Sequence, residues 1–351
     1  MVKNGVLLYA AHPTGAIDAD TYFAYAERDL DLARAPLSGG VLLRTLFLSS
    51  DPYLRVRMCA PEARSFVPPF RLGEPVDNFG VAQVLRSEDP HLAPGDYVVG
   101  YLDFAEYSVY PGKDPHEFKI PLTKVQVLPG IPLSVYLGTL GMPGTTAFQG
   151  LTYFCADKLK TAEVMFVSGG AGPVGTFVIE YAKLLAPHVK IVASAGTSEK
   201  LRIMQSVGAD VVFNYKEQDA VKVLQEQRPL DIFWDNTGGP QLDAALQNFR
   251  DEGLIISCGA ISQNNLDEKT AVKHIGEFSR RSLTMRGILV YKGESAAVAP
   301  RFYDEVVPLV LQGKITSREH RYQGLQQAGK ALADVHRGAN TGKAVIVVAE
   351  E

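Results

Sequence analysis

The chain contains 351 residues, enough for about two domains, and 46% of them are apolar against 21% charged, which is typical of a globular protein. With 35 Lys and Arg against 39 Asp and Glu, the formal net charge is −4, so the sequence lacks the basic surplus that nucleic-acid binding requires. Three widely spaced cysteines exclude a disulfide framework, no apolar run reaches about 18 residues, and the start is not a secretory leader. These features predict a cytoplasmic protein with no membrane partner.

The first part of the chain, up to about Pro143, consists of short strand-like segments that Gly and Pro interrupt repeatedly. Enrichment in β-branched and aromatic residues predicts strands at 41–48, 80–85, 97–101 and 105–110. A Pro-Gly turn leads directly into the third of these, as in the strands of a compact barrel. We therefore predict a β-barrel domain over residues 1–140.

After Pro143, short apolar strands alternate with segments of helical periodicity. Helices are predicted at 174–185 and from Ser198. The predicted strands are at 164–168, 190–195, 211–214, 232–235, 254–258 and 286–290. Continuous apolar strands joined by helices predict a parallel sheet that is covered on both faces, here over residues 141–311.

The last segment, residues 312–351, contains a helix-like stretch at 325–335 and a final strand at 344–349. This strand could rejoin the first domain. The fold class predicted for the whole chain is α/β.

A glycine-rich turn follows the strand at 164–168 directly and precedes the helix at 174–185. It matches G-x-G-x-x-G. The first glycine allows a tight turn, the second lets the backbone approach a pyrophosphate, and the third lets the helix pack on the strand. The pattern predicts a dinucleotide site, the alternative being a turn that binds nothing. Its residues are Gly170, Ala171, Gly172, Pro173, Val174 and Gly175.

The end of the second strand decides between the two nicotinamide dinucleotides, because an NAD enzyme places an acid there against the ribose 2′-hydroxyl. Residues 192–198 read VASAGTS, and the first acid is Glu199. Small hydroxyl residues and Lys200 could bind a 2′-phosphate, which favours NADPH. The alternative for Lys200 is an exposed charge at an ordinary helix start.

No metal site is predicted. A catalytic zinc needs three protein ligands, and the seven His residues are scattered, with none paired at i, i+4 or placed beside a cysteine. Hydride transfer without a Lewis acid needs an acceptor that takes hydride easily, such as an alkene conjugated to a carbonyl, or donors for the developing oxyanion.

Several blocks of the sequence resemble one family, and they occur in its order. The family is the zinc-independent branch of the medium-chain dehydrogenases/reductases, specifically the prostaglandin reductase, leukotriene 12-hydroxydehydrogenase and alkenal double-bond reductase group. The blocks are residues 48–58, 138–147, 167–175, 235–239, 258–262 and 340–344. The resemblance implies a GroES-like β-barrel domain interrupted by a Rossmann domain, with the active site in the cleft between them. It also implies NADPH-dependent reduction of α,β-unsaturated ketones and aldehydes by a homodimer.

The resemblance also implies roles for individual residues. Tyr53 matches a tyrosine that reaches toward substrate and is the expected catalytic residue, a hydrogen-bond donor to the developing oxyanion, although a buried structural tyrosine is the alternative. Asn264 stands where the family usually has a tyrosine and is the second expected substrate contact, and its amide can donate a hydrogen bond but is not an acid. Besides the glycine turn, the cofactor contacts implied are Thr146, Lys200, Tyr215, Asn236, Cys258, Gly259, Ala260, Ile261, Ser262, Ile288, Leu289, Val290 and Asn340.

Two other functions stay open at this point. One is a zinc-independent quinone oxidoreductase, which would pass hydride to a flat acceptor without an oriented carbonyl. The other is a protein that binds NADPH without catalysis. The physiological substrate does not follow from the sequence.

Overall fold

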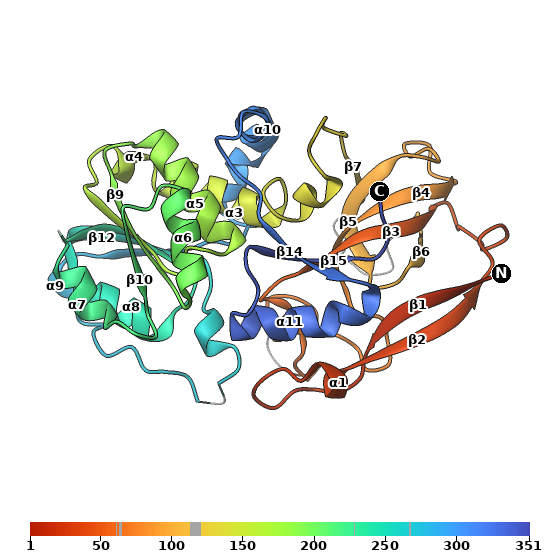
Figure 1. The fold of residues 1–351 in the computed structure, drawn as a ribbon, viewed down its shortest axis with the longest axis horizontal. Helices are drawn as coiled ribbons and strands as arrows, with labels where there is room; N and C mark the ends of the chain where they lie inside the picture. The colour runs from red at the N-terminus through yellow and green to blue at the C-terminus, as the bar shows by residue number, and fades with distance from the viewer. Residues whose placement is uncertain (61, 63–64, 113–120, 228, 267) are drawn as a thin grey trace. The chain divides into compact units, whose positions relative to one another are not determined.

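The computed structural model describes residues 1–351 except 61, 63–64, 113–120, 228 and 267, and the chain divides into two compact units (Figure 1). Unit 1 comprises residues 1–137 and 319–351, and unit 2 comprises residues 138–318. The predicted divisions lie at 140/141 and 311/312. Both lie away from the limits of these units. Residues 312–318 stay with unit 2 because Thr316 donates two hydrogen bonds to the Glu180 carboxylate, at 3.0 and 2.6 Å.

Unit 2 is built on a six-stranded sheet in which every pair of neighbouring strands is parallel. The strand order is β10-β9-β8-β11-β12-β13, so the chain winds outward from β8 in one direction and then from β11 in the other. Ligands of such sheets bind at the carboxyl ends of the strands where the direction changes. The strands are β8 (Val164–Val167), β9 (Lys190–Ala195), β10 (Val211–Asn214), β11 (Leu230–Asp235), β12 (Phe249–Ser257) and β13 (Thr284–Gly287).

Helices cover both faces of this sheet. Right-handed crossovers place α5 and α6 on one face, and α7 and α8 share an apolar core with the strands on the other (Figure 1). In that core Phe166 stacks between Phe213 and Phe233. The helices and helical turns are α3 (Met142–Gln149), η2 (Gly150–Phe154), α4 (Ala156–Leu159), α5 (Pro173–Leu185), α6 (Ser198–Ser206), α7 (Ala220–Gln225), α8 (Gly239–Leu246), η3 (Ile261–Gln263), α9 (Glu277–Arg280), η4 (Glu294–Arg301) and α10 (Phe302–Leu311).

The strand predicted at 286–290 is wrong in its position, because β13 starts two residues earlier and ends at Gly287. After Ile288 donates its N–H to Ser257 at 3.2 Å, the chain turns and Lys292 donates back to Leu289 at 2.9 Å. Residues 288–290 therefore belong to a turn after the strand, and not to the strand itself.

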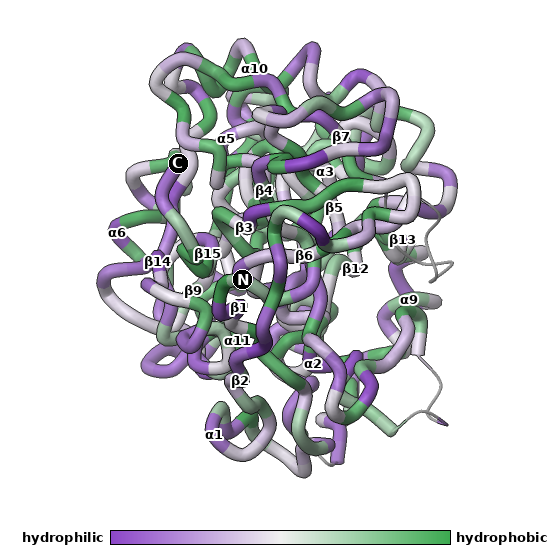
Figure 2. The backbone as a smooth tube through the Cα atoms, turned by 90° about the vertical axis from the view of Figure 1, so that its right-hand side faces the viewer, coloured by the Kyte–Doolittle hydropathy of each residue, from purple (hydrophilic) through white to green (hydrophobic). Residues whose placement is uncertain are grey.

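Unit 1 contains a seven-stranded sheet in the order β14-β15-β3-β4-β5-β7, with β6 also paired to β3. The predicted return of the last strand is confirmed: β15 pairs antiparallel with β3. Its other neighbour, β14, is hydrophilic and lies at the sheet edge, whereas β15 is apolar and buried (Figure 2). The strands are β3 (Val41–Ser50), β4 (Asp77–Ser87), β5 (Tyr97–Asp103), β6 (Tyr107–Tyr110), β7 (Thr123–Lys124), β14 (Glu319–Gln323) and β15 (Lys343–Val347).

A hairpin of β1 (Val2–Tyr9) and β2 (Phe23–Leu30) precedes this sheet, and the sequence did not reveal it. Only one residue of β2 is buried, so the strand shows no alternating apolar pattern. The helices and helical turns of unit 1 are α1 (Ala19–Tyr22), α2 (Leu54–Arg57), η1 (Leu133–Leu137), η5 (Leu325–Gln327) and α11 (Ala328–Arg337).

The predicted α/β class, with a doubly wound parallel sheet and a separate β-rich unit, is confirmed. None of the helices in the described part of the chain has the length and apolar character that crossing a bilayer requires.

Candidate active site

The glycine turn lies between β8 and α5, and its shape depends on contacts that a side chain would prevent. A Cβ at Gly175 would lie 2.5 Å from the carbonyl oxygen of Gly169, and one at Gly170 would lie 2.7 Å from Sδ of Met204. At Gly172 the only such contact is at 3.4 Å, so this side of the turn is open. The turn thus packs tightly on itself and against Met204 of α6, and it leaves backbone accessible at the start of α5, which suits a pyrophosphate.

Basic and hydroxyl side chains from α6 and from the segment after β10 lie close to the end of β9. Thr197 caps α6, its side chain accepting a hydrogen bond from the Lys200 N–H at 3.4 Å. A Cβ at Gly196 would lie 2.9 Å from Cε of Lys216 and 3.1 Å from the Tyr215 hydroxyl, so both side chains lie over this glycine. Burial lowers the pKa of Lys200, and the charge of Lys216 lowers it further. These side chains suit a phosphate. Lys216 is not among the phosphate-binding residues predicted from the sequence, although its position next to Tyr215 could have indicated it.

Asn236 lies at the point where the winding direction changes. Its side chain donates to the Ser168 carbonyl at 2.7 Å and accepts from the indole of Trp234 at 3.2 Å. The neighbouring Asp235 carboxylate accepts from the N–H groups of Thr237 and Gly238 at 2.9 and 2.8 Å. Burial raises the pKa of Asp235 even though these hydrogen bonds oppose the shift. The side chain of Asn236 therefore orders the ends of β8 and β11, and its contact with a cofactor stays a prediction.

The segment after β12 is fixed to the same turn. Cys258 and Gly259 donate their N–H groups to the carbonyl of Asp235 at 2.9 and 3.0 Å, and the Ser262 hydroxyl donates to the Thr237 carbonyl at 2.7 Å. Burial raises the pKa of the Cys258 thiol to about 12, so it is a neutral group and not a nucleophile. The structure thus brings residues 258–262 beside Asn236.

The loop after Ser262 contains the position where a tyrosine was expected. The Gln263 side chain donates to the Ser262 hydroxyl at 2.7 Å and accepts from the Thr270 N–H at 2.8 Å, which folds the loop back on itself. Asn264 follows the η3 turn and donates its N–H to Ile261 at 3.2 Å. A contact of Asn264 with substrate stays a prediction.

Helix α3 joins the predicted threonine to the turn after β13. The Thr146 hydroxyl donates back to the Met142 carbonyl at 2.8 Å, and Gln149, one turn further on, donates to the Val290 carbonyl at 2.9 Å. Gln149 is fully buried. The structure therefore brings Thr146 and Val290 to one part of unit 2, and the link through Gln149 had no signal in the sequence.

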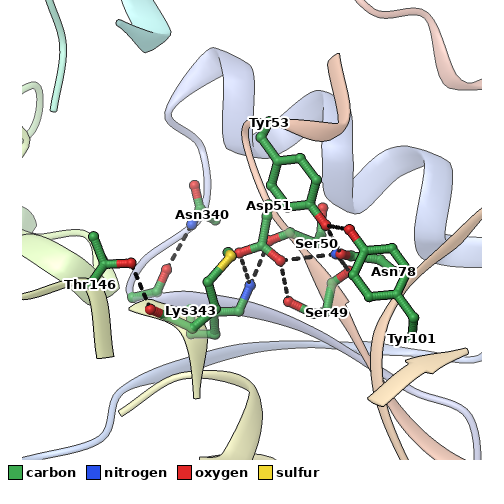
Figure 3. Close-up of polar contacts among 11 residues, drawn as sticks. Ser49, Ser50, Asp51, Tyr53, Asn78, Tyr101, Thr146, Asn340 and Lys343 are labelled. Atoms are coloured by element: carbon green, nitrogen blue, oxygen red, sulfur yellow. Dashed lines mark hydrogen bonds and ion pairs between the residues drawn. The ribbon is translucent and has the colours of Figure 1, made fainter. Parts of the chain in front are cut away.

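In unit 1, Tyr53 is part of a buried polar network (Figure 3). The Asp51 carboxylate accepts from Nζ of Lys343 at 2.9 Å, from Nδ2 of Asn78 at 2.9 Å and from the Ser49 hydroxyl. The Tyr53 hydroxyl contacts both Oδ1 of Asn78 and the Tyr101 hydroxyl. Burial, with added contributions from Tyr101 and Asp51, raises the pKa of Tyr53 well above its ordinary value. Tyr53 is therefore a neutral phenol, which can donate a hydrogen bond to an oxygen atom.

The last predicted cofactor contact, Asn340, lies in the turn before β15, where its side chain donates to the Gly342 carbonyl at 2.8 Å. Unit 1 thus holds Tyr53 and Asn340, and unit 2 holds the other predicted residues. That these two sets form one site in a cleft stays a prediction. Among the described residues, no group of three or more His, Cys, Asp and Glu side chains could hold a metal ion.

Comparison with known protein families shows to which family the chain belongs. Residues 6–118 match the family described as the N-terminal domain of oxidoreductase, and residues 173–310 match the family described as zinc-binding dehydrogenase. The matches cover more than half of the chain, which therefore belongs to the medium-chain dehydrogenase/reductase family. Within it, the chain belongs to the zinc-independent alkenal reductase group, as the sequence motifs predicted.

Three proteins are similar to the chain along most of its length. A zinc-type alcohol dehydrogenase-like protein of Schizosaccharomyces pombe is 35% identical over the full length of both chains. An NADP-dependent 2-alkenal reductase of Nicotiana tabacum is 38% identical over 90% of this chain and 89% of its own. The crystal structure of CurA from Vibrio vulnificus in complex with NADPH has a TM-score of 0.86 at 28% identity, over 99% of this chain and 100% of that one.

Proposed function

We propose that this protein reduces the carbon–carbon double bond of α,β-unsaturated aldehydes and ketones with NADPH. The observation that carries the proposal is the open glycine turn beside an acid-free strand end with two lysines, in a chain 38% identical to an NADP-dependent 2-alkenal reductase. The protein is an oxidoreductase of this group, and its substrate is a small molecule.

The residues of unit 2 fit the cofactor. The backbone from Gly170 to Gly175 would hold the pyrophosphate, because a Cβ at Gly175 would collide with the backbone while the side of Gly172 is open. Lys200, Tyr215 and Lys216 would hold the 2′-phosphate. When bound, NADPH supplies a hydride for the β-carbon of the substrate. We assign the remaining predicted contacts, Thr146, Asn236, residues 258–262, residues 288–290 and Asn340, to the same cofactor.

The residues of unit 1 fit the substrate oxygen. As the β-carbon gains a hydride, negative charge moves to the carbonyl oxygen, and a neutral phenol at Tyr53 can donate a hydrogen bond to it. One proton must then reach the α-carbon. The amide of Asn264 cannot supply it, so water or a hydroxyl in contact with water is the donor. The sum is one hydride and one proton added across the double bond.

We also propose that the protein is a cytoplasmic homodimer. The three free cysteines favour a reducing compartment. β13 ends the six-stranded sheet of unit 2, all four of its residues are exposed, and Met285 is among them, so this edge could pair with a second copy. Light scattering coupled to size-exclusion chromatography tests this; a monomer at micromolar concentration would contradict it.

The test of the function is NADPH oxidation against a graded set of enals, enones and prostanoid ketones, with a small quinone alongside. We expect turnover of the conjugated carbonyl compounds and saturated products with retained carbonyl groups. Tyr53→Phe should lower enone turnover by about 100-fold, because that is the usual effect of removing one oxyanion donor, with NADPH affinity little changed. Turnover of the quinone alone, or of no acceptor at all, would contradict the proposal.

A further inference from the structure

The side-chain amide of Asn78 has only one orientation that satisfies its surroundings. Its Nδ2 donates to the Ser49 carbonyl at 2.8 Å and to the Asp51 carboxylate at 2.9 Å, and both of these groups can only accept. Asn78 is fully buried on β4, so exchanging its N and O atoms would place two acceptors against its oxygen. The amide oxygen of Asn78 must therefore face Tyr53.

This orientation fixes the direction of the hydrogen bonds that follow. Because the amide oxygen of Asn78 accepts only, the Tyr53 hydroxyl donates its single hydrogen to it. The contact between the two phenols must then be donated by Tyr101 to the Tyr53 oxygen. The row of hydrogen bonds therefore runs from Tyr101 through Tyr53 and Asn78 to the Asp51 carboxylate. Lys343 donates to that carboxylate from the opposite side (Figure 3).

Tyr101 is held firmly in this position. It is a buried residue of β5, its ring packs on Phe79 with 4.9 Å between centroids, and the Arg57 guanidinium lies 5.7 Å from its ring centroid. Arg57 is itself fixed by the Asp77 carboxylate at 2.5 Å and by the Pro68 carbonyl at 2.9 Å. The donor that points at Tyr53 therefore belongs to a rigid part of unit 1.

This row of hydrogen bonds cannot deliver a proton to Tyr53 from the protein interior. A proton relay needs groups that can both give up and receive a proton, and the amide of Asn78 interrupts the path between Asp51 and Tyr53. The network is therefore a device for orientation. The hydroxyl hydrogen of Tyr53 can rotate from Asn78 to another acceptor while the ring stays in place.

We propose that Tyr101 is a positioning residue for Tyr53 in enone reduction, an inference that rests on the proposed function. When the hydrogen of Tyr53 turns from Asn78 to the substrate oxygen, the hydrogen bond from Tyr101 stays on the Tyr53 oxygen. A phenol that accepts one hydrogen bond is a stronger donor of the next, because successive hydrogen bonds polarise one another. Tyr101 thus holds the Tyr53 oxygen and strengthens its hydrogen bond to the charge that develops on the substrate.

The experiment is a double-variant cycle of Tyr53→Phe and Tyr101→Phe, measured as kcat for an enone that the wild type reduces. Tyr101→Phe alone should lower kcat about three- to tenfold, the usual effect of one hydrogen bond, with the affinity for NADPH unchanged. In the Tyr53→Phe background the same change should have no further effect, because the oxygen on which Tyr101 acts is absent. Tyr322→Phe is the matched control: its buried hydroxyl donates to Asp334, elsewhere in unit 1, and its loss should leave kcat unchanged.

Circular dichroism and NADPH affinity establish that each variant is folded. A folded Tyr101→Phe protein with wild-type kcat would overturn the inference, and so would equal losses in the wild-type and Tyr53→Phe backgrounds, which indicate general damage to the fold. Either result leaves the proposed function standing. If the wild type reduces no enone, the proposed function itself fails, and the inference fails with it.

Discussion

The two units build their predicted binding residues in different ways. In unit 2 the predicted site consists of short segments at the ends of neighbouring parallel strands: the glycine turn, the Asp235–Gly239 turn and residues 258–262. Backbone groups make most of the hydrogen bonds that hold these segments in place. In unit 1 the site consists of side chains that are far apart in the sequence, from Asp51, Asn78, Tyr101 and Lys343. A site built from backbone depends on the absence of side chains, whereas a buried polar network depends on every member being present. In unit 2 the harmful substitutions should therefore be those that add a side chain, and in unit 1 those that remove a member of the network.

The largest effect is expected from Lys343→Met. Lys343 is 2% exposed and bonds only to the Ser50 carbonyl and the Asp51 carboxylate, at 2.7 and 2.9 Å, among the contacts of the described residues. Removing one partner leaves a buried charge uncompensated, which typically costs about 3–5 kcal/mol. Chemical denaturation should show this loss in the unfolding free energy of unit 1.

The control for that variant is Lys3→Met, which removes an ion pair with Asp29 in the same unit. Both side chains are more than half exposed, so water screens the pair and its loss should cost far less stability than the loss of Lys343. If the two substitutions cost the same, the view that unit 1 depends on its buried network is wrong.

The next effect is a dependence of stability on pH that arises from His336 in α11. Burial lowers the pKa of His336 to about 4 from its ordinary 6.5. Between these values the unfolded chain binds the proton and the folded chain does not, so stability is complete above pH 6.5 and falls as the pH is lowered toward 4. The expected loss is roughly 2–3 kcal/mol.

Thermal unfolding across this pH range checks the prediction. His336→Phe should flatten the profile, whereas His91→Gln, at an exposed position of the same unit, should not change it. An acid-sensitive profile that persists in His336→Phe would assign the effect to other groups.

Gly175→Ala and Gly172→Ala separate two functions of the glycine turn. A methyl at position 175 would collide with the backbone of Gly169, and such overpacking costs about 1–3 kcal/mol of stability. A methyl at position 172 meets little of the protein, so stability should stay while the affinity for NADPH falls on the order of tenfold. Thermal unfolding and a fluorescence titration with NADPH measure the two quantities; equal behaviour of the variants would contradict this division.

The smallest effect is expected from Lys216→Ala. Hydrogen bonds to charged groups are worth about 1.5–3 kcal/mol. Because Lys216 is exposed and water weakens its interaction, we expect the low end of this range, and the dissociation constant for NADPH should rise about tenfold at most. The constant for NADH should not change. Lys222→Ala, an exposed lysine of α7, serves as the control. Equal weakening of both dinucleotides would remove Lys216 from the phosphate site.

The sequence predicted unit 2 more completely than unit 1. The predicted bounds of β9 and β10 are correct, because each strand is a short apolar run. The predicted start of α6 is also correct, because Thr197 caps the helix. The sequence predicts a strand at 288–290 where the structure has a turn, since apolar residues do not reveal where a ladder of hydrogen bonds ends. The hairpin of β1 and β2 was missed because most of β2 is exposed.

The sequence by itself determined the class of the fold, the glycine turn, the acid-free end of β9 and the family. These are local properties, since each depends on residues within a few positions of one another. Only the tertiary structure decided that Asn78, Tyr101 and Lys343 surround Tyr53 and Asp51, and that Lys216 joins Tyr215 over Gly196. The reason is that strand pairing and side-chain packing set these contacts, which join residues up to 292 positions apart, and no spacing along the chain encodes them.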